Sequence, residues 1–171
     1  MARVVADTSA LLSIASAPEV LDPVFNEYDV LVPREVVDEL EETAEYDDGT
    51  ANTADEVLNR LDDDAVRDAE PDTDFPLDEV ENAAVSLVNE ENVDLFLCDD
   101  FNRIGLIHAS LTDVRLVTTP KLLDVLVHKD ALSDEEEAVD ALDDMTEARS
   151  WKGNSYVRRA RETLPDSSEG S

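Results

Sequence analysis

The chain has 171 residues and is strongly acidic: 44 Asp and Glu stand against 13 Lys and Arg, for a formal net charge of −31 at pH 7. Hydrophobic residues make up 42% of the chain, which suffices for a core and excludes collagen-like and low-complexity classes. Self-repulsion on this scale destabilises a compact state in dilute buffer, but in molar salt the Debye length falls to about 3 Å. The regular apolar runs favour a folded protein of a halophile over a disordered chain. The charge alone does not exclude a nucleic-acid substrate.

A cytoplasmic location is expected from the cysteine count and the apolar pattern. Cys98 is the single cysteine and cannot form an internal disulfide, which suits a reducing compartment. The opening residues superficially resemble a signal peptide, but an Asp and a Thr interrupt their apolar run. No apolar run approaches the roughly 20 residues that a transmembrane helix needs, so no membrane insertion is expected.

Short apolar runs and helical patterns alternate along the first part of the chain. The apolar, β-branched run before Asp7 predicts a buried strand, and Thr8 or Ser9 is a plausible cap for the helix that follows. Pro33 opens another helix, at a position where proline is tolerated. In chain order we expect a strand at 3–6, a helix at 8–15, a helix at 18–28, a strand at 28–32 and a helix from residue 33.

Residues 41–76 form the least regular part of the sequence. A turn is expected at 45–50, a helix with an apolar stripe at 51–69 and a loop at 70–76. We predict that this acidic insertion forms a helical hairpin that covers one side of the sheet.

The rest of the chain resumes the alternation of strands and helices. Asp78 and Glu81 have the spacing of a capping box, and Pro120 stands in the first turn of a later helix. We expect a helix at 78–91, a strand at 94–98, a helix at 101–110, a strand at 114–117, and helices at 119–129, 133–149 and 150–164. Apolar strands that alternate with helices predict a parallel sheet covered on both faces. The expected fold is one three-layer α/β/α domain over residues 1–164, followed by a disordered tail at 165–171.

Three aspartates stand where apolar strands are expected to end. Asp7 follows the first strand, and Asp99 and Asp100 follow the third. Open parallel sheets bind ligands beyond the carboxyl ends of their strands, so these carboxylates are expected at one edge. Neighbouring carboxylates tolerate one another around Mg²⁺ or Mn²⁺, which take oxygen ligands and activate water for attack on phosphate. An Asp in such a place can also simply cap the next helix, and both interpretations stay open.

Other site chemistries find no support in the sequence. His108 and His128 are solitary and no Cys/His cluster exists, so zinc is not expected. The four glycines form no phosphate-binding loop. Receiver-type phosphotransfer modules need a second acid beside Asp7, and phosphatases with a D-x-D motif have an Asp where this chain has Ser9.

Several segments resemble, in family order, the motifs of PIN-domain ribonucleases over roughly residues 3–129. That family's first four motifs are similar to VVADTSALLSI, LVPREVVDEL, ENAAVSLVNE and LFLCDDFNRIGLIHA. Its final strand and helix are similar to VRLVTTPKLLDVLV, and the C-terminal helix of a toxin-type (VapC-like) subgroup is similar to SWKGNSYVRRARETL. The resemblance implies the same three-layer α/β/α architecture.

The resemblance also implies a metal-dependent nuclease that cleaves single-stranded RNA and uses Mg²⁺ or Mn²⁺. The partners expected with it are the RNA, an antitoxin protein and a second copy of the chain. Ser9 would position a ligand water or a phosphate, and Arg103 would contact substrate or pair with carboxylates of the site. The acids that it implies as catalytic are Asp7, Glu39, Glu81, Asp99 and Asp100, and all but Glu39 are expected as metal ligands.

The sequence departs from the family's pattern at two of these motifs. Cys98 stands nearest to the position where the family often has Thr, so a hydroxyl contact in the site is in doubt. The third motif offers several acids. Glu81 is preferred because apolar residues follow it at the expected offsets, and Glu79 is the reserve. The choice between Asp99 and Asp100 stays open.

A basic segment closes the expected domain. Five of the 13 basic residues lie within 149–161, beside Trp151 and Tyr156. Such a segment could bind phosphates and stack on bases, but we favour a basic helix at 149–164 that docks on the acidic body. For the whole chain, the alternative to an enzyme is a catalytically weak PIN-like module that binds RNA or assembles through a partner.

Overall fold

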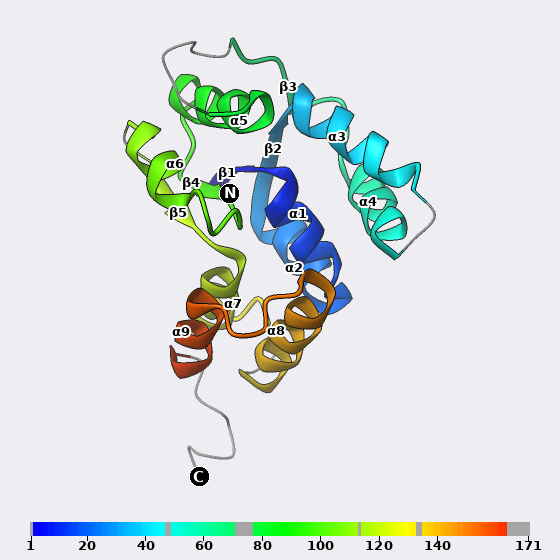
Figure 1. Cartoon of the computed structure of the whole chain (residues 1–171), viewed down its shortest axis with the longest axis vertical. Coiled ribbons are helices and arrows are strands. Elements are labelled where there is room, and N and C mark those ends of the chain that lie inside the picture. Colours follow the sequence, from blue (N-terminus) through cyan, green and yellow to red (C-terminus); the bar gives the residue numbers. More distant parts are fainter. Residues whose placement is uncertain (1, 47–48, 71–76, 113, 133–134, 164–171) are drawn as a thin grey trace.

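The computed structural model describes residues 2–46, 49–70, 77–112, 114–132 and 135–163, which surround a five-stranded sheet (Figure 1). The strands are β1 (Ala2–Ala6), β2 (Tyr28–Pro33), β3 (Val66–Arg67), β4 (Leu95–Leu97) and β5 (Arg115–Val117). They lie in the order β3-β2-β1-β4-β5, and all neighbouring pairs are parallel. The predicted parallel sheet is confirmed.

β1 lies in the middle of the sheet, where the strand order reverses. From β1 the chain moves outward to β2 and β3, and then returns to place β4 on the other side of β1 and β5 beyond it. Val5 of β1 is in register with Leu31 on one side and with Phe96 on the other. Open parallel sheets bind ligands at such a reversal, beyond the carboxyl ends of the strands.

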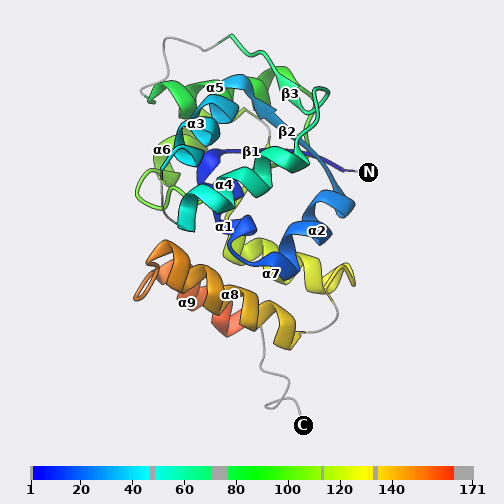
Figure 2. The same cartoon turned by 90° about the vertical axis from the view of Figure 1, so that its right-hand side faces the viewer.

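Alternate strand residues face two separate layers of helices. Val5 and Phe96 pack with residues of α5 and α6, whereas Val4 and Leu97 belong to a larger core on the opposite face. Figures 1 and 2 show α5 and α6 on one side of the strands and α1, α2 and α7 on the other, so the predicted three-layer α/β/α fold is confirmed.

Within the described ranges, none of the helices is long and apolar enough to span a membrane. The described helices are α1 (Thr8–Ala15), α2 (Pro18–Glu27), α3 (Arg34–Ala44), α4 (Gly49–Arg60), α5 (Glu79–Glu90), α6 (Ile104–Ser110), α7 (Thr119–His128), α8 (Glu135–Arg149) and α9 (Ser155–Thr163).

The predicted helical hairpin at 41–76 is wrong at its C-terminal end. α3 and α4 do pack together, but α4 ends at Arg60 instead of continuing to residue 69. Three consecutive aspartates follow, and the Asp62 carboxylate accepts a hydrogen bond from the Ala65 N–H at 2.9 Å, which favours a turn. β3 then pairs with the end of β2 and adds a strand that the apolar pattern did not predict.

The C-terminal helix also starts later than predicted, at Ser155 instead of residue 150. Ser150 and Gly153 have φ angles of 58° and 82°, and these left-handed conformations end the helical path between α8 and α9. The predicted tail (165–171) and most of the predicted loop at 70–76 lie outside the described residues.

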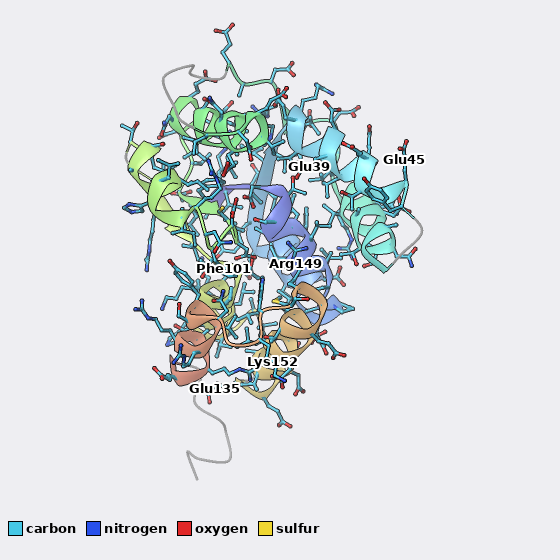
Figure 3. All side chains as sticks on the ribbon, viewed as in Figure 1. Glu39, Glu45, Phe101, Glu135, Arg149 and Lys152 are labelled. Atoms are coloured by element: carbon cyan, nitrogen blue, oxygen red, sulfur yellow. The ribbon has the colours of Figure 1, made fainter. Side chains whose placement is uncertain are left out.

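The basic C-terminal segment docks on the body through aromatic rings. Trp151 is 7% exposed and meets Phe101 edge-on, with their ring centroids 5.2 Å apart. Tyr156 of α9 stacks on Phe101 with their ring centroids 5.0 Å apart, and Figure 3 labels Phe101 just above α9. Arg161 forms an ion pair with Asp143 of α8. These contacts agree with a docked basic helix.

We expect Trp151→Ala to lower the free energy of unfolding by about 3–5 kcal/mol, because it removes a buried aromatic side chain and leaves a cavity beside Phe101. Urea or thermal unfolding in molar KCl measures the loss. Lys152→Ala is the matched control, since Lys152 is exposed and its truncation is expected to change the free energy by less than about 0.5 kcal/mol. Equal stabilities of the two variants would contradict the docking described above.

Candidate active site

The carboxyl ends of β1 and β4 meet at the reversal of the strand order. Asp7 follows β1 directly, and Asp99 stands two residues after β4. The Asp7 N–H donates to the Leu97 carbonyl oxygen at 3.1 Å, which joins the two strand ends. Asp7 is 6% exposed and Asp99 is 5% exposed. The structure therefore brings these two acids, buried, to one edge of the sheet.

Asp7 caps the helix that follows it. Its Oδ1 accepts hydrogen bonds from the Ala10 N–H at 3.0 Å and from the Ser9 hydroxyl at 2.7 Å. The prediction that Thr8 or Ser9 caps this helix is wrong, because an Asp at the N-cap accepts well from the amide three residues on. Asp7 therefore caps α1 and belongs to the candidate site at the same time.

The second carboxylate oxygen of Asp7 faces a thiol. Cys98 Sγ donates to Asp7 Oδ2 at 3.0 Å. Burial and the neighbouring Asp7 charge raise the pKa of the Cys98 thiol, so it stays protonated and acts as a donor. Cys98 lies in the core, and sequence reasoning, which placed a hydroxyl contact here in doubt, missed this contact of the thiol. The Thr that the family often has nearby was the signal that a donor is needed here.

Ser9 links the two buried acids. Its hydroxyl donates to Asp7 Oδ1 and accepts from the Asp99 N–H at 3.0 Å. Ser9 lies at the start of α1 and Asp99 just after β4, so this one oxygen fixes the spacing between two separate elements. In the structure Ser9 binds the Asp7 carboxylate and the Asp99 backbone, while its predicted contact with water or phosphate stays a prediction.

Asp99 is held on one side and unpartnered on the other. Its Oδ1 accepts from the Thr119 N–H at 2.6 Å, at the start of α7. Its Oδ2 is buried and has no hydrogen-bond partner among the described residues. Sequence reasoning missed Thr119. The amides at the N-terminus of a helix have no partners within the helix, and the TTPK run at the start of α7 indicated such donors near the site.

Asp100 is half-buried and lies near enough to Asp7 for its charge to act on that side chain. It also acts on Arg103, which precedes the first turn of α6. Helix α6 begins at Ile104, so the predicted start at residue 101 is wrong, and the Arg103 N–H bonds the Asp100 carbonyl oxygen at 3.0 Å instead. Asp99 is the more deeply buried of the two adjacent acids.

Glu81 is tied to Arg103. Arg103 Nε lies 2.7 Å from Oε1 and 2.6 Å from Oε2 of Glu81. Glu81 also completes the predicted capping box with Asp78, which is confirmed. Burial raises the pKa of Glu81, and the Arg103 guanidinium opposes that rise. Glu79 is exposed at the start of α5, so Glu81 is the buried acid of this motif.

Glu39 is a residue of helix α3 and does not stand at a strand end as Asp7 and Asp99 do. It is half-buried on α3, where Figure 3 labels it, and its backbone carbonyl accepts from the Thr43 hydroxyl at 2.9 Å. Among the described residues its carboxylate forms no ion pair with a basic side chain. Its role in a site stays a prediction.

Burial disfavours the charged forms of both aspartates, Asp7 and Asp99. Burial raises the pKa of Asp99 to about 7; the Asp7 charge adds to the rise and the Thr119 N–H opposes it. Burial likewise raises the pKa of Asp7, against the hydrogen bonds that it accepts, and the Asp100 charge adds to it. Positive charge placed between these carboxylates would relieve both effects.

The donor set at this edge fits a hard divalent cation. Mg²⁺ usually keeps several waters and is held by one or two carboxylates together with substrate phosphates, which matches Asp7 and the unpartnered oxygen of Asp99. Within the described ranges, no group of three or more His, Cys, Asp or Glu side chains is arranged to hold a metal. The structure therefore brings Asp7 and Asp99 to one edge of the sheet with Asp100 beside them, and the places of Glu81 and Glu39 in a metal site stay predictions.

Comparisons with known proteins identify the family. A family model described as DUF3368, a PIN domain, matches residues 3–164. Searches of curated proteins and of solved structures returned no match. PIN domains are in general nucleases, which are hydrolases. Because the matched range contains all five candidate acids and nearly the whole chain, this protein belongs to the PIN-domain family.

Proposed function

We propose that this PIN domain is a metal-dependent endoribonuclease that hydrolyses phosphodiester bonds of single-stranded RNA. The observation that carries the proposal is the buried pair Asp7 and Asp99 at the strand reversal, linked by Ser9, with one Asp99 oxygen left without a partner. Oxygen ligands of this kind suit Mg²⁺ or Mn²⁺. The nuclease activity general to PIN domains supplies the reaction class.

Asp7 and Asp99 would hold the cation, and Asp100, Glu81 and Glu39 are proposed as the further acids of the site. When bound, a divalent cation supplies a Lewis acid for the phosphate and lowers the pKa of a water molecule. The protein's own contribution is the placement of the acids, because preorganised groups need no rearrangement during the reaction.

Three neighbours carry out that placement. The Ser9 hydroxyl spaces the two aspartates, and the Thr119 N–H orients Asp99. The Arg103 side chain forms an ion pair with Glu81 and is 38% exposed beside the acids of the site. We keep Arg103 as a proposed substrate-binding residue on that ground.

The proposal is tested by incubating the protein with end-labelled single-stranded RNA in molar KCl. We expect cleavage with Mn²⁺ or Mg²⁺ and none when EDTA removes the metal. Duplex RNA and single-stranded DNA of the same sequence are the matched substrates, and both are expected to be cut more slowly. Cleavage that persists unchanged in EDTA would refute the metal requirement.

The resemblance and the composition motivate three finer proposals. The C-terminal segment that resembles toxin-type nucleases supports a toxin of a toxin–antitoxin pair, with an antitoxin protein and a second copy of the chain as partners. The net charge of −31 supports a halophile's protein that folds at high salt. The single buried cysteine supports a reducing, cytoplasmic setting.

A catalytically weak module that binds RNA or works through a partner is the second candidate. One observation favours it: among the described residues no three acids gather to hold a metal, and Glu81 is engaged by Arg103. The RNA assay separates the two functions. If the chain is a weak module, we expect it to bind the RNA and leave it uncut when metal is added.

A further inference from the structure

A second candidate site lies beside the edge strand β5. A cavity of about 300 Å³ opens between β5 and the helices α6, α7 and α9. Figure 1 shows α6 and α9 on the same side of the molecule as β5. We call this cavity the β5 pocket. Its volume lies at the lower end of the range for small-ligand sites.

The β5 pocket is basic in a strongly acidic protein. Arg115 of β5, Lys121 of α7 and Arg159 of α9 line it, together with His108 of α6. No acidic residue is among the described residues that line it, although the chain has 44 Asp and Glu against 13 Lys and Arg. Arg115 makes no ion pair within the described ranges, and Lys121 Nζ lies 3.1 Å from Asp124 Oδ2. Basic side chains therefore gather in the wall of the pocket without an acidic one among its described residues, which favours an anion.

The same pocket offers a surface for a flat apolar group. Its remaining wall includes aliphatic side chains of α6, β5 and α9 and the side chain of Tyr156. Tyr156 is stacked on Phe101, so its ring is held in place. Nucleobases pack on such aromatic and aliphatic surfaces with little dependence on sequence. A nucleotide uses both parts of this pocket, because its phosphate can bind the basic side chains and its base can pack on the apolar wall. A bare phosphate would leave the apolar wall unused.

Two chain connections join the β5 pocket to the candidate active site. Thr118 lines the pocket, and the next residue, Thr119, donates its N–H to Asp99 at 2.6 Å. Phe101, which stacks on Tyr156 of the pocket, comes directly after Asp100. The pocket and the carboxylates are therefore neighbours in the fold.

We propose that the β5 pocket holds one nucleotide of the RNA strand next to the bond that is cut. Its phosphate lies against Arg115 and Arg159, and its base packs against the aliphatic wall beside Tyr156. The proposal rests on the proposed function for the identity of the strand. It adds a binding subsite that lies outside the carboxylate pair and has its own measurable ligand.

The test measures binding without cleavage. Fluorescence anisotropy of fluorescein-labelled single-stranded RNA of mixed sequence is recorded in EDTA over a series of KCl concentrations at which circular dichroism shows a folded protein. Arg115→Gln and Arg159→Gln are each expected to weaken binding about fivefold and to lower the slope of log affinity against log salt by about 0.7, the loss of one phosphate contact. Arg158→Gln is the matched control, because Arg158 is exposed on the same helix and does not line the pocket. Pocket variants that bind like the Arg158 variant would overturn the proposal.

A second readout identifies the ligand class. Saturation-transfer NMR with adenosine 5′-monophosphate is expected to show binding to the wild type that is lost in Arg115→Gln. Competition by inorganic phosphate as strong as that by the nucleotide would show a simple anion site and overturn the nucleotide assignment.

The experiments distinguish failure of the β5 pocket proposal from failure of the nuclease proposal. Metal-dependent cleavage with unchanged binding in the pocket variants refutes the β5 pocket alone, and pocket-dependent binding without any cleavage refutes the nuclease alone.

Discussion

Asp7→Asn should abolish RNA cleavage while the protein stays folded. The substitution removes a charge from the carboxylate pair but keeps an oxygen that can accept from the Ala10 N–H and the Ser9 hydroxyl. Asn is as good an N-cap as Asp, so α1 should keep its start. Loss of one preorganised charged group from such a site is expected to lower the rate by a factor on the order of 10³.

The measurement is the initial rate of cleavage of single-stranded RNA with Mn²⁺ in molar KCl, beside circular dichroism of each variant. Asp29→Asn is the matched control: it makes the same change in net charge at an exposed position of β2. It should cut RNA at the wild-type rate. A folded Asp7→Asn variant that cuts as fast as the wild type would remove Asp7 from the mechanism.

Asp99→Asn should stabilise the metal-free protein at neutral and alkaline pH. The pKa of Asp99 rises from the ordinary 3.8 to about 7 in the fold, mainly through burial. The folded state therefore binds the Asp99 proton more tightly than the unfolded state does, and stability falls as pH rises through this window and stays low above it. An Asn cannot ionise, so the variant escapes this loss. The difference between the two pKa values corresponds to at most roughly 4 kcal/mol.

Urea unfolding in EDTA at pH 4 and at pH 8 tests this expectation. The advantage of Asp99→Asn over the wild type should be small at the lower pH and largest at the higher one, with Asp29→Asn showing no such trend. Mn²⁺ should then raise the stability of the wild type and leave Asp99→Asn almost unchanged, because only a site that binds the ion gains from it. A variant less stable than the wild type at pH 8 would show that the Asp99 charge is compensated in the fold.

The elements that the sequence predicted well are those in which local signals agree. The run before Asp7 is apolar and β-branched, and the helix after Asp78 has both a capping box and an apolar face. β3 gave no such signal, because it is two residues long and its pairing with β2 depends on the rest of the sheet. Short edge strands are fixed by their neighbours rather than by their own composition.

In the candidate site, too, some features follow from local sequence signals and others depend on tertiary packing. The positions of Asp7 and Asp99 follow from the rule that parallel strands end at one edge, and the sequence alone located them there. The sequence also predicted that Arg103 contacts substrate or pairs with carboxylates of the site, but the choice of Glu81 as its partner depends on how α5 and the start of α6 pack, which no spacing in the chain encodes. The Cys98 thiol and the Thr119 amide reach the carboxylates from residues that look like ordinary core and helix-start positions.

The buried position of Cys98 makes its thiol a natural probe for opening of the sheet edge around it. The only sulfhydryl of the chain is fully enclosed beneath the edge where β1 and β4 end, and it must ionise before an alkylating reagent can attack it. Such a reagent can therefore act only during excursions in which that edge separates and lets solvent in. The rate of alkylation, followed by mass spectrometry, would report how often that edge opens, with no engineered label.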